Sequence, residues 1–183
     1  MSSTLGMAIL TLLSREPLTG YEISRSMKGP IRFFWQVAHS QVYPELARLE
    51  KEALVTHERA PGPGKPNQKR YSLTGAGRKA LKAWLVGPLE ETPKRSELCL
   101  RAYGIAQADP RRAKALFQKE AGKHRAWGTE LDHHRSELEL SAGSTLEDHR
   151  SQAFADYAVL MRGIAFERAN AEWCAWMAER LNA

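Results

Sequence analysis

Apolar residues recur at helical spacing through one central stretch, which runs from His39 to Leu54. The stripe lies at positions i, i+4, i+7 and i+11, a pattern typical of a helix with one buried face. Its members are Val42, Leu46, Leu49 and Ala53. The opposite face is polar and basic, and consists of Ser40, Gln41, Pro44, Arg48 and Lys51. This pattern fits an ordinary solvated helix, and it also fits a helix that lies in a DNA major groove. Pro44 belongs in or next to the first turn, which favours a start at Ser40 or Gln41.

Two shorter helices are predicted before this stretch. Apolar residues between Leu5 and Leu13 form the first, with Ser2, Ser3 and Thr4 as candidate caps and Pro17 as its stop. Thr19 and Glu22 form a capping box that opens the second at Gly20 or Tyr21, with Ile23 and Met27 facing inward. Gly29-Pro30 ends it, and an aromatic connector from Ile31 to Val37 follows, which we expect to plug the core.

The residues after the central helix predict a β-hairpin and one more helix. Leu54–Arg59 and Lys69–Thr74 have the mixed β-branched and polar content of short strands. Between them, APGPGKPNQ holds three prolines and two glycines, so we expect a hairpin tip there. Thr74 caps the next helix, which Gly87-Pro88 ends. Its expected inner face consists of Ala80, Leu81, Trp84 and Leu85.

The second half of the chain is predicted to be helical. One helix spans Glu97–Ala106, and Asp109-Pro110 is a strong start signal for a long helix that ends near Ser141. A heptad-like seam runs along that long helix through Phe117, His124, Leu131 and Leu138. Ser144 and Glu147 form a candidate capping box for a last helix that ends near Leu181. Two long helices cannot bury wide apolar stripes on each other alone, so a third helix or a partner chain is expected.

Charge is divided unevenly between the two halves. Met1–Pro88 holds 13 lysine and arginine residues against 6 glutamates, whereas Leu89–Ala183 holds 14 against 15 acidic residues. The net charge of +6 therefore comes from the first half. A basic domain joined to a near-neutral one indicates a module that binds a polyanion, together with a second function.

Composition indicates a soluble cytoplasmic protein. No apolar run approaches 18 residues, so no transmembrane helix is expected. Met1–Arg15 lacks a basic n-region and a cleavage site, which predicts no signal peptide. Cys99 and Cys174 are far apart in helical apolar contexts and are interpreted as buried free thiols of a reducing compartment.

Three helices followed by a basic hairpin is the order of a winged helix-turn-helix. The predicted fold class is therefore mainly α: a winged-helix DNA-binding domain over 1–88 with a two-stranded β wing, then an all-helical dimerisation domain over 89–183. Effector sensing is a candidate second role of the helical domain. The central helix would enter the major groove. The cations of the wing would reach the phosphates or the minor groove beside it.

Three segments resemble the PadR family of bacterial transcriptional regulators. They are ILTLLSREPLTGYEI, FFWQVAHSQVYPELARLEKEALVT and GPGKPNQKRYSLTGAGRKALKAWL, and AVLMRGIAFERANAEWCAWM resembles the helical C-terminal domain of its larger members. Ala53 departs from the family, which commonly has Gly after the third helix. We expect a slightly longer helix or a right-handed helical residue at this position. The resemblance implies a winged-helix dimer, mostly a repressor, which in several members is released from DNA by small aromatic or other apolar effectors.

Candidate DNA contacts follow from the pattern. Tyr21 and Tyr43 could donate hydroxyls to phosphates or pack at a helix corner, Gln41 could contact adenine, and Arg48 could instead pair with Glu45 or Glu52. The candidate set is Tyr21, Ser40, Gln41, Tyr43, Pro44, Arg48, Lys51, Lys65, Lys69 and Arg70. The rival interpretation is a winged-helix scaffold that binds a protein and not DNA, for which an apolar patch on this face would be more typical.

No residue pattern supports catalysis or a cofactor. His133, His134 and His149 lack metal-ligand spacing with either cysteine, and GPGKP is not a Walker loop. Aromatic side chains in the second half could line an effector pocket or simply pack in the core and the dimer interface. The candidate effector-binding residues are Trp35, Trp127, Tyr157 and Trp173. We therefore expect a homodimeric transcriptional regulator, a repressor of a pseudo-palindromic operator, that binds no cofactor or metal.

Overall fold

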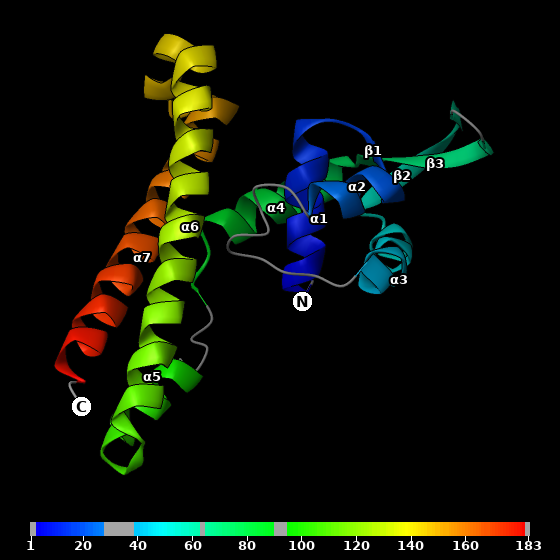
Figure 1. The fold of residues 1–183 in the computed structure, drawn as a ribbon. Coiled ribbons are helices and arrows are strands. Elements are labelled where there is room, and N and C mark those ends of the chain that lie inside the picture. Colours follow the sequence, from blue (N-terminus) through cyan, green and yellow to red (C-terminus); the bar gives the residue numbers. More distant parts are fainter. Residues whose placement is uncertain (1–2, 28–38, 63–64, 90–94, 182–183) are drawn as a thin grey trace. The chain divides into compact units, whose positions relative to one another are not determined.

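The computed structural model describes residues 3–27, 39–62, 65–89 and 95–181 (Figure 1). The chain divides into two compact units, Met1–Glu91 and Thr92–Ala183. Each unit has its own buried hydrophobic cluster.

The first unit has the predicted winged-helix order. Its helices are α1 (Thr4–Arg15), α2 (Gly20–Ser26), α3 (His39–Lys51) and α4 (Gly75–Leu85), and its strands are β1 (Leu18–Thr19), β2 (Val55–Gly62) and β3 (Lys65–Leu73). The predicted caps are confirmed, because the side chains of Ser3, Thr19 and Thr74 accept backbone N–H groups at the starts of α1, α2 and α4. The aromatic connector lies outside the described residues.

The wing is the predicted two-stranded hairpin of β2 and β3, but the sheet also has a third strand. The strand order is β1-β3-β2, and both pairings are antiparallel. Leu18 pairs with Tyr71, and Thr19 with Arg70, so β1 joins the hairpin from the segment before α2. The hairpin is also longer than predicted, since pairing continues past a bulge near Ala60 to Gly62 and Lys65. Proline and glycine are tolerated there because the end of a two-stranded ribbon has free edges.

The core of the first unit is formed by α1, α2, α3 and the sheet. Fully buried side chains include Ile9, Leu10, Ile23, Val42, Leu46 and Leu49. The expected inner face of α4 is partly wrong. Leu81 is buried, but Trp84 is 44% exposed and Leu85 is 60% exposed.

The turn after α3 differs from the expectation for Ala53. Its φ of +55° is left-handed, whereas we expected a right-handed helical residue. The N–H of Leu54 donates to the carbonyl of Leu49 at 2.9 Å, and that of Ala53 donates to Glu50 at 3.0 Å. These two bonds form a Schellman motif with alanine at the position that glycine usually takes.

The second unit is a long helical hairpin with one short helix packed on it. Its elements are α5 (Glu97–Tyr103), η2 (Ile105–Gln107), α6 (Pro110–Ala142), η3 (Gly143–Glu147) and α7 (Gln152–Arg180). Asp109 caps α6, as predicted. The proposed Ser144 capping box is wrong, because Gly143–Glu147 is a 3-10 helix and Ser151 caps α7.

The core of the second unit follows the predicted seam of α6 in part. Phe117 and Leu131 are buried, and Phe117 meets Trp173 edge-on at 5.7 Å between ring centroids. Cys174 is buried as expected, but Cys99 is exposed, which corrects its prediction. Among the described residues, no helix is long and apolar enough to cross a membrane.

Candidate nucleic-acid interface

Helix α3 separates its buried and exposed residues cleanly. Val42, Leu46 and Leu49 have no exposed surface. The exposed row on the opposite side consists of Ser40, Pro44, Ala47 and Lys51, and we call it the outer row of α3. Gln41 is also exposed, beside this row. Of the outer row, sequence reasoning missed Ala47, although the spacing of Ser40, Pro44 and Lys51 points to it.

Pro44 lies inside α3 and not in its first turn, because the helix begins at His39 and not at Ser40 or Gln41. A proline at this position has no N–H to donate, so it cannot bond the carbonyl of Ser40 four residues earlier. That carbonyl lies near the start of α3, in the exposed part of the helix.

Arg48 is paired with two carboxylates of its own helix. Its Nη2 lies 2.5 Å from Oε1 of Glu45, its Nε donates to Glu45 at 3.0 Å, and it also pairs with Glu52. The hydroxyl of Ser3 donates to the same Glu45, which ties the start of α1 to α3. The proposed pairing of Arg48 with its helix neighbours is therefore confirmed. Its guanidinium is engaged by these carboxylates in the absence of DNA, and the predicted contact of Arg48 with DNA stays a prediction.

Gly6 on α1 leaves room for the ends of these two side chains. A Cβ at Gly6 would lie 2.5 Å from Oε1 of Glu45 and 2.8 Å from Nη2 of Arg48. The hydrogen bond from Arg48 lowers the pKa of Glu45, although burial opposes this, and Glu45 in turn raises the pKa of Arg48. The ion pair lies within α3 on one flank of the outer row and packs against α1 at Gly6, while the bond from Ser3 to Glu45 joins the two helices.

The wing is joined to the other flank of α3 through Glu50. This carboxylate pairs with Nδ1 of His57 on β2 and lies 3.5 Å from Nζ of Lys69 on β3. Burial raises the pKa of Glu50, but the bond from His57 and the charges of His57 and Lys69 outweigh it and lower the pKa. The Lys69 side chain is half exposed despite this contact.

Arg70 connects β3 to the start of α2. Its Nη1 donates to the carbonyl of Pro17 at 2.8 Å, and its Nη2 lies 3.5 Å from Glu22. The backbone N–H of Thr19 is the main cause of the lowered pKa of Glu22, and Arg70 adds to it. Lys65 belongs to β3, but its side chain lies outside the described residues.

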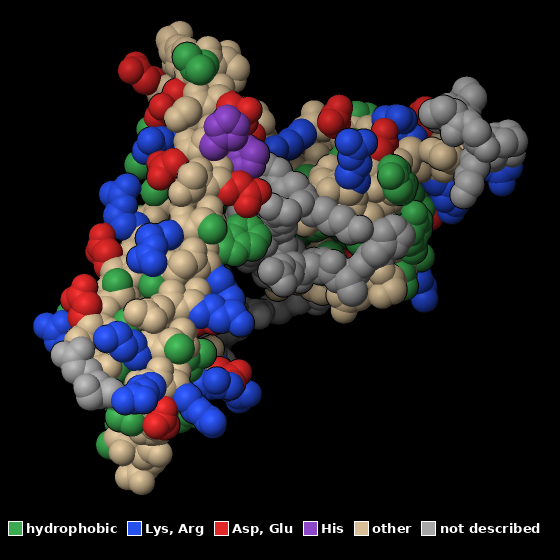
Figure 2. Space-filling view, in the orientation of Figure 1, with side chains coloured by type: hydrophobic (Ala, Val, Ile, Leu, Met, Phe, Trp, Pro, Cys, Tyr) green, Lys and Arg blue, Asp and Glu red, His purple; other side chains and the backbone are tan. Residues whose placement is uncertain are grey.

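Tyr21 and Tyr43 lie at the corner between α2 and α3. Tyr21 is 63% exposed and Tyr43 is 48% exposed. A Cβ at Gly20 would lie 2.7 Å from the Tyr43 ring, so the ring rests against the α2 backbone. Figure 2 shows hydrophobic side chains along the edge formed by α2 and α3, with basic side chains near the sheet. The Tyr43 ring therefore packs on α2 while about half of its surface stays exposed, and Tyr21 is more exposed still.

The candidate effector residues do not form one site within the second unit. Trp173 lies level with Phe117, and Tyr157 donates to Glu139 at 3.2 Å. Trp127 lies on α6 between Phe117 and Glu139. At the rise of an α-helix it is about 15 Å along the axis from Phe117 and about 18 Å from Glu139. Trp35 lies outside the described residues. The effector assignment stays a prediction.

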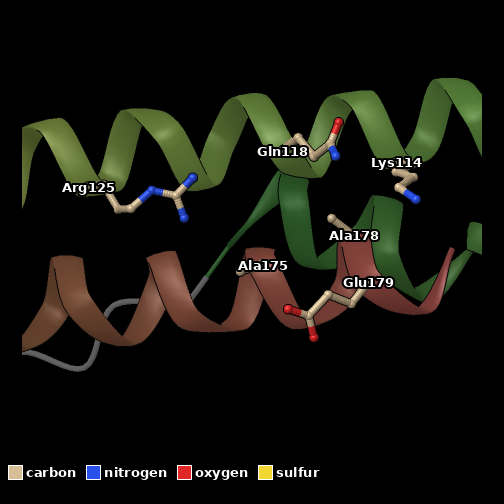
Figure 3. Close-up of a pocket in the computed structure, with 6 residues that line it drawn as sticks. All are labelled: Lys114, Gln118, Arg125, Ala175, Ala178 and Glu179. Atoms are coloured by element: carbon tan, nitrogen blue, oxygen red, sulfur yellow. The ribbon is translucent and has the colours of Figure 1, made fainter.

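One surface hollow lies between α6 and α7, and charged and polar side chains line it together with two alanines. It is lined by Lys114, Gln118, Arg125, Ala175, Ala178 and Glu179 (Figure 3). No aromatic side chain lines it, so it does not match the predicted effector pocket. In the part of the chain that is described, no group of three His, Cys, Asp or Glu side chains could hold a metal ion.

Comparison with known proteins identifies the family. The description "Transcriptional regulator PadR-like family" matches residues 9–83, and "Virulence activator alpha C-term" matches residues 94–182. The negative transcriptional regulator PadR of Bacillus subtilis is 33% identical over 168 residues, which is 91% of each chain.

Solved structures agree with this assignment. Bacillus subtilis PadR in complex with operator DNA has a TM-score of 0.87 at 31% identity, covering 98% of this chain and 100% of that one. The same protein in complex with p-coumaric acid has a TM-score of 0.80 at 31% identity, covering 99% and 100%. The Vibrio cholerae virulence activator AphA has a TM-score of 0.73 at 25% identity, covering 98% of each chain. The chain therefore belongs to the PadR-like family of transcriptional regulators, and not to a family of enzymes.

Proposed function

We propose that this protein is a homodimeric repressor that binds a pseudo-palindromic operator through α3 and the wing. The observation that carries the proposal is the outer row of α3, which is exposed beside a basic hairpin. In this arrangement two copies of α3 enter successive major grooves, about 34–36 Å apart. Lys51 and the wing cations bind phosphates, whereas the start of α3 meets the base edges. The Bacillus subtilis relative, which is named a negative regulator, has been solved with operator DNA.

The direct test is binding of the full-length chain to the DNA upstream of its own gene at two salt concentrations. We expect a specific complex whose affinity falls with salt, because phosphate contacts release counterions. A scrambled duplex of the same composition is the control. Equal binding to both duplexes would contradict a sequence-specific regulator, and no binding to either would favour the protein-binding scaffold.

The wing is tested by replacing Lys65, Lys69 and Arg70 with alanine. Affinity should fall about equally for specific and scrambled duplexes, since phosphates carry no sequence information. The slope of log K against log salt should become shallower by about 0.9 for each phosphate that the variant no longer binds. Replacement of Lys114, Lys119 and Lys123 on α6 is the matched control. An unchanged slope in the wing variant would show that the wing does not touch DNA.

The homodimer is supported by the apolar surface of the second unit. α5 covers one end of the hairpin, yet large hydrophobic side chains remain exposed along α6 and α7. They are Trp127, Leu140, Phe154, Val159, Met161, Phe166 and Trp176. Exposed apolar surface on this scale is typical of a protein interface. A second copy of the chain is the partner that a palindromic site requires.

We also propose a small aromatic effector that releases the protein from DNA. The proposal is supported by the Bacillus subtilis relative, which has been solved with p-coumaric acid. The candidate residues remain Trp35, Trp127, Tyr157 and Trp173. The test is titration with phenolic acids, followed by tryptophan fluorescence and by operator release. A tenfold release requires the effector to bind the released state about 1.4 kcal/mol more tightly. Quenching without any change in operator affinity would contradict the proposal.

A further inference from the structure

The outer row of α3 offers few hydrogen bonds to bases. From its start it presents the hydroxyl of Ser40, the ring of Pro44 and the methyl group of Ala47, and all three residues are exposed. Lys51 follows only in the last turn. In helix-turn-helix proteins the N-terminal residues of the recognition helix contact the base edges, so the part of the row that meets them holds one hydroxyl and two apolar groups.

The arginine that could read guanine is withdrawn from this face. Bidentate contact of arginine with O6 and N7 of guanine is the commonest specific contact in the major groove. Arg48, however, bonds Glu45 through two nitrogens and Glu52 through a third, and its side chain is 32% exposed. Breaking these charge-assisted bonds to reach a base would leave two carboxylates facing DNA phosphates.

Gln41 and the apolar members of the outer row match adenine and thymine. Gln41 can bond N6 and N7 of adenine, and small apolar groups contact the thymine 5-methyl group. We propose that α3 recognises A·T pairs, with Ala47 and Pro44 packed against thymine methyl groups and Gln41 bonded to adenine. This inference rests on the proposed DNA-binding function and names the chemistry of its target.

The experiment begins with a random-sequence duplex library, from which the full-length chain selects its preferred sites. We expect selected half-sites with A·T pairs at the positions that α3 faces. Each selected thymine is then replaced by deoxyuridine, which removes the methyl group and keeps the base pairing. Affinity should fall about fourfold at a contacted thymine, the value of one buried methyl group. Deoxyuridine at thymines outside the half-sites is the control.

Substitution of Ala47 tests whether its methyl group is the one that contacts a given thymine. In Ala47→Gly the protein methyl group is absent, so the deoxyuridine effect at its thymine should disappear while the effects at other thymines persist. Ala47→Ser keeps the size of the side chain and should retain most of the helix stability. It provides a second measurement if the glycine variant folds poorly. Persistence of the full deoxyuridine effect in both variants would overturn the role of Ala47.

Arg48→Lys tests the exclusion of guanine recognition. This variant keeps a cation beside Glu45 and Glu52 but loses the planar donor pair. We expect the same selected consensus as for the unchanged protein. A consensus with G·C pairs facing α3 that Arg48→Lys abolishes would overturn the inference. Enrichment of no sequence at all would instead overturn the proposed function, so the two failures are distinguishable.

Discussion

At the scale of single residues, the most informative position is Ala53. Its backbone is left-handed, a conformation that brings Cβ close to the following carbonyl in any residue except glycine. The strain persists because the Schellman bonds to Leu49 and Glu50 are made there. The hydroxyl of Thr74 also donates to the carbonyl of Ala53, at 2.7 Å. Hydrogen bonds from α3 and from Thr74 therefore hold the turn, and the cost is a strained backbone at Ala53.

We expect Ala53→Gly to stabilise the protein by about 0.5–1 kcal/mol, since relief of the strain exceeds the added entropy of the unfolded chain. The midpoint of urea unfolding measures it. Ala47→Gly is the matched control, because it places glycine in the exposed interior of α3 and should cost about 1 kcal/mol. Loss of stability in both variants would show that Ala53 is not strained.

At the scale of elements, α4 depends on one close approach. A Cβ at Gly77 would lie 2.0 Å from the carbonyl oxygen of Leu54, whereas nothing lies within 4 Å of one at Gly75. Both glycines lie in the first turn of α4. The chain therefore offers a matched pair, with the same substitution in the same turn and opposite surroundings.

Gly77→Ala should destabilise the first unit by about 3 kcal/mol or more, because a backbone oxygen cannot move aside as a side chain can. Gly75→Ala should be neutral or stabilise by up to about 1 kcal/mol. Thermal unfolding followed by circular dichroism compares the two. Equal melting temperatures would mean that α4 moves away from the turn after α3 at little cost.

Elements set by local chemistry could be predicted from the sequence, whereas those set by distant partners could not. Thr19 with Glu22 and Asp109 with Pro110 carry their own start signals, and both helices begin there. β1 is two residues long and exists only because β3 lies beside it. No local pattern could reveal it.

The same distinction applies to the candidate site. The exposed positions of α3 follow from the period of its buried stripe. Ala47 also follows from this period, but sequence reasoning missed it because it carries no polar group. The attachment of Lys69 to Glu50 and of Arg70 to Glu22 depends on the folded sheet. The sequence therefore indicated a basic surface, but not that carboxylates restrain three of its cations.

At the scale of the whole molecule, these carboxylates make stability depend on acidity. The pKa values of Glu22, Glu45 and Glu50 are all lowered in the folded protein. Folding then gains its full benefit above the unfolded value near 4.5. The benefit is lost as the pH falls through the lower folded values, because the unfolded chain binds more protons.

We expect the melting temperature of the first unit to fall between pH 5 and pH 3 by more than in a variant with glutamine at Glu22, Glu45 and Glu50. The variant should be less stable at pH 7 and should show a flatter profile. Differential scanning calorimetry at several pH values makes the comparison. Parallel profiles would mean that other groups govern the acid transition.

The proposed dimer interface can be tested by substitutions on the exposed surface of α7. Val159→Glu and Met161→Glu place charges on exposed apolar positions of α7, where they cost the single chain little. The double variant should be monomeric by sedimentation, with unchanged helical content and at least tenfold weaker operator binding, since two half-sites no longer bind as a unit. A dimer of unchanged stability would place the interface elsewhere.

The short pairing of β1 with β3 has a consequence for local opening. It joins Thr19 to Arg70 and so encloses α2, α3 and β2 in one closed segment of the chain. Forming such a long closure costs several kcal/mol of chain entropy, which is recovered only when the enclosed elements pack together. Helix α3 therefore belongs to the same cooperative unit as the sheet. Amide hydrogens of α3 and β3 should exchange with solvent at a common opening free energy.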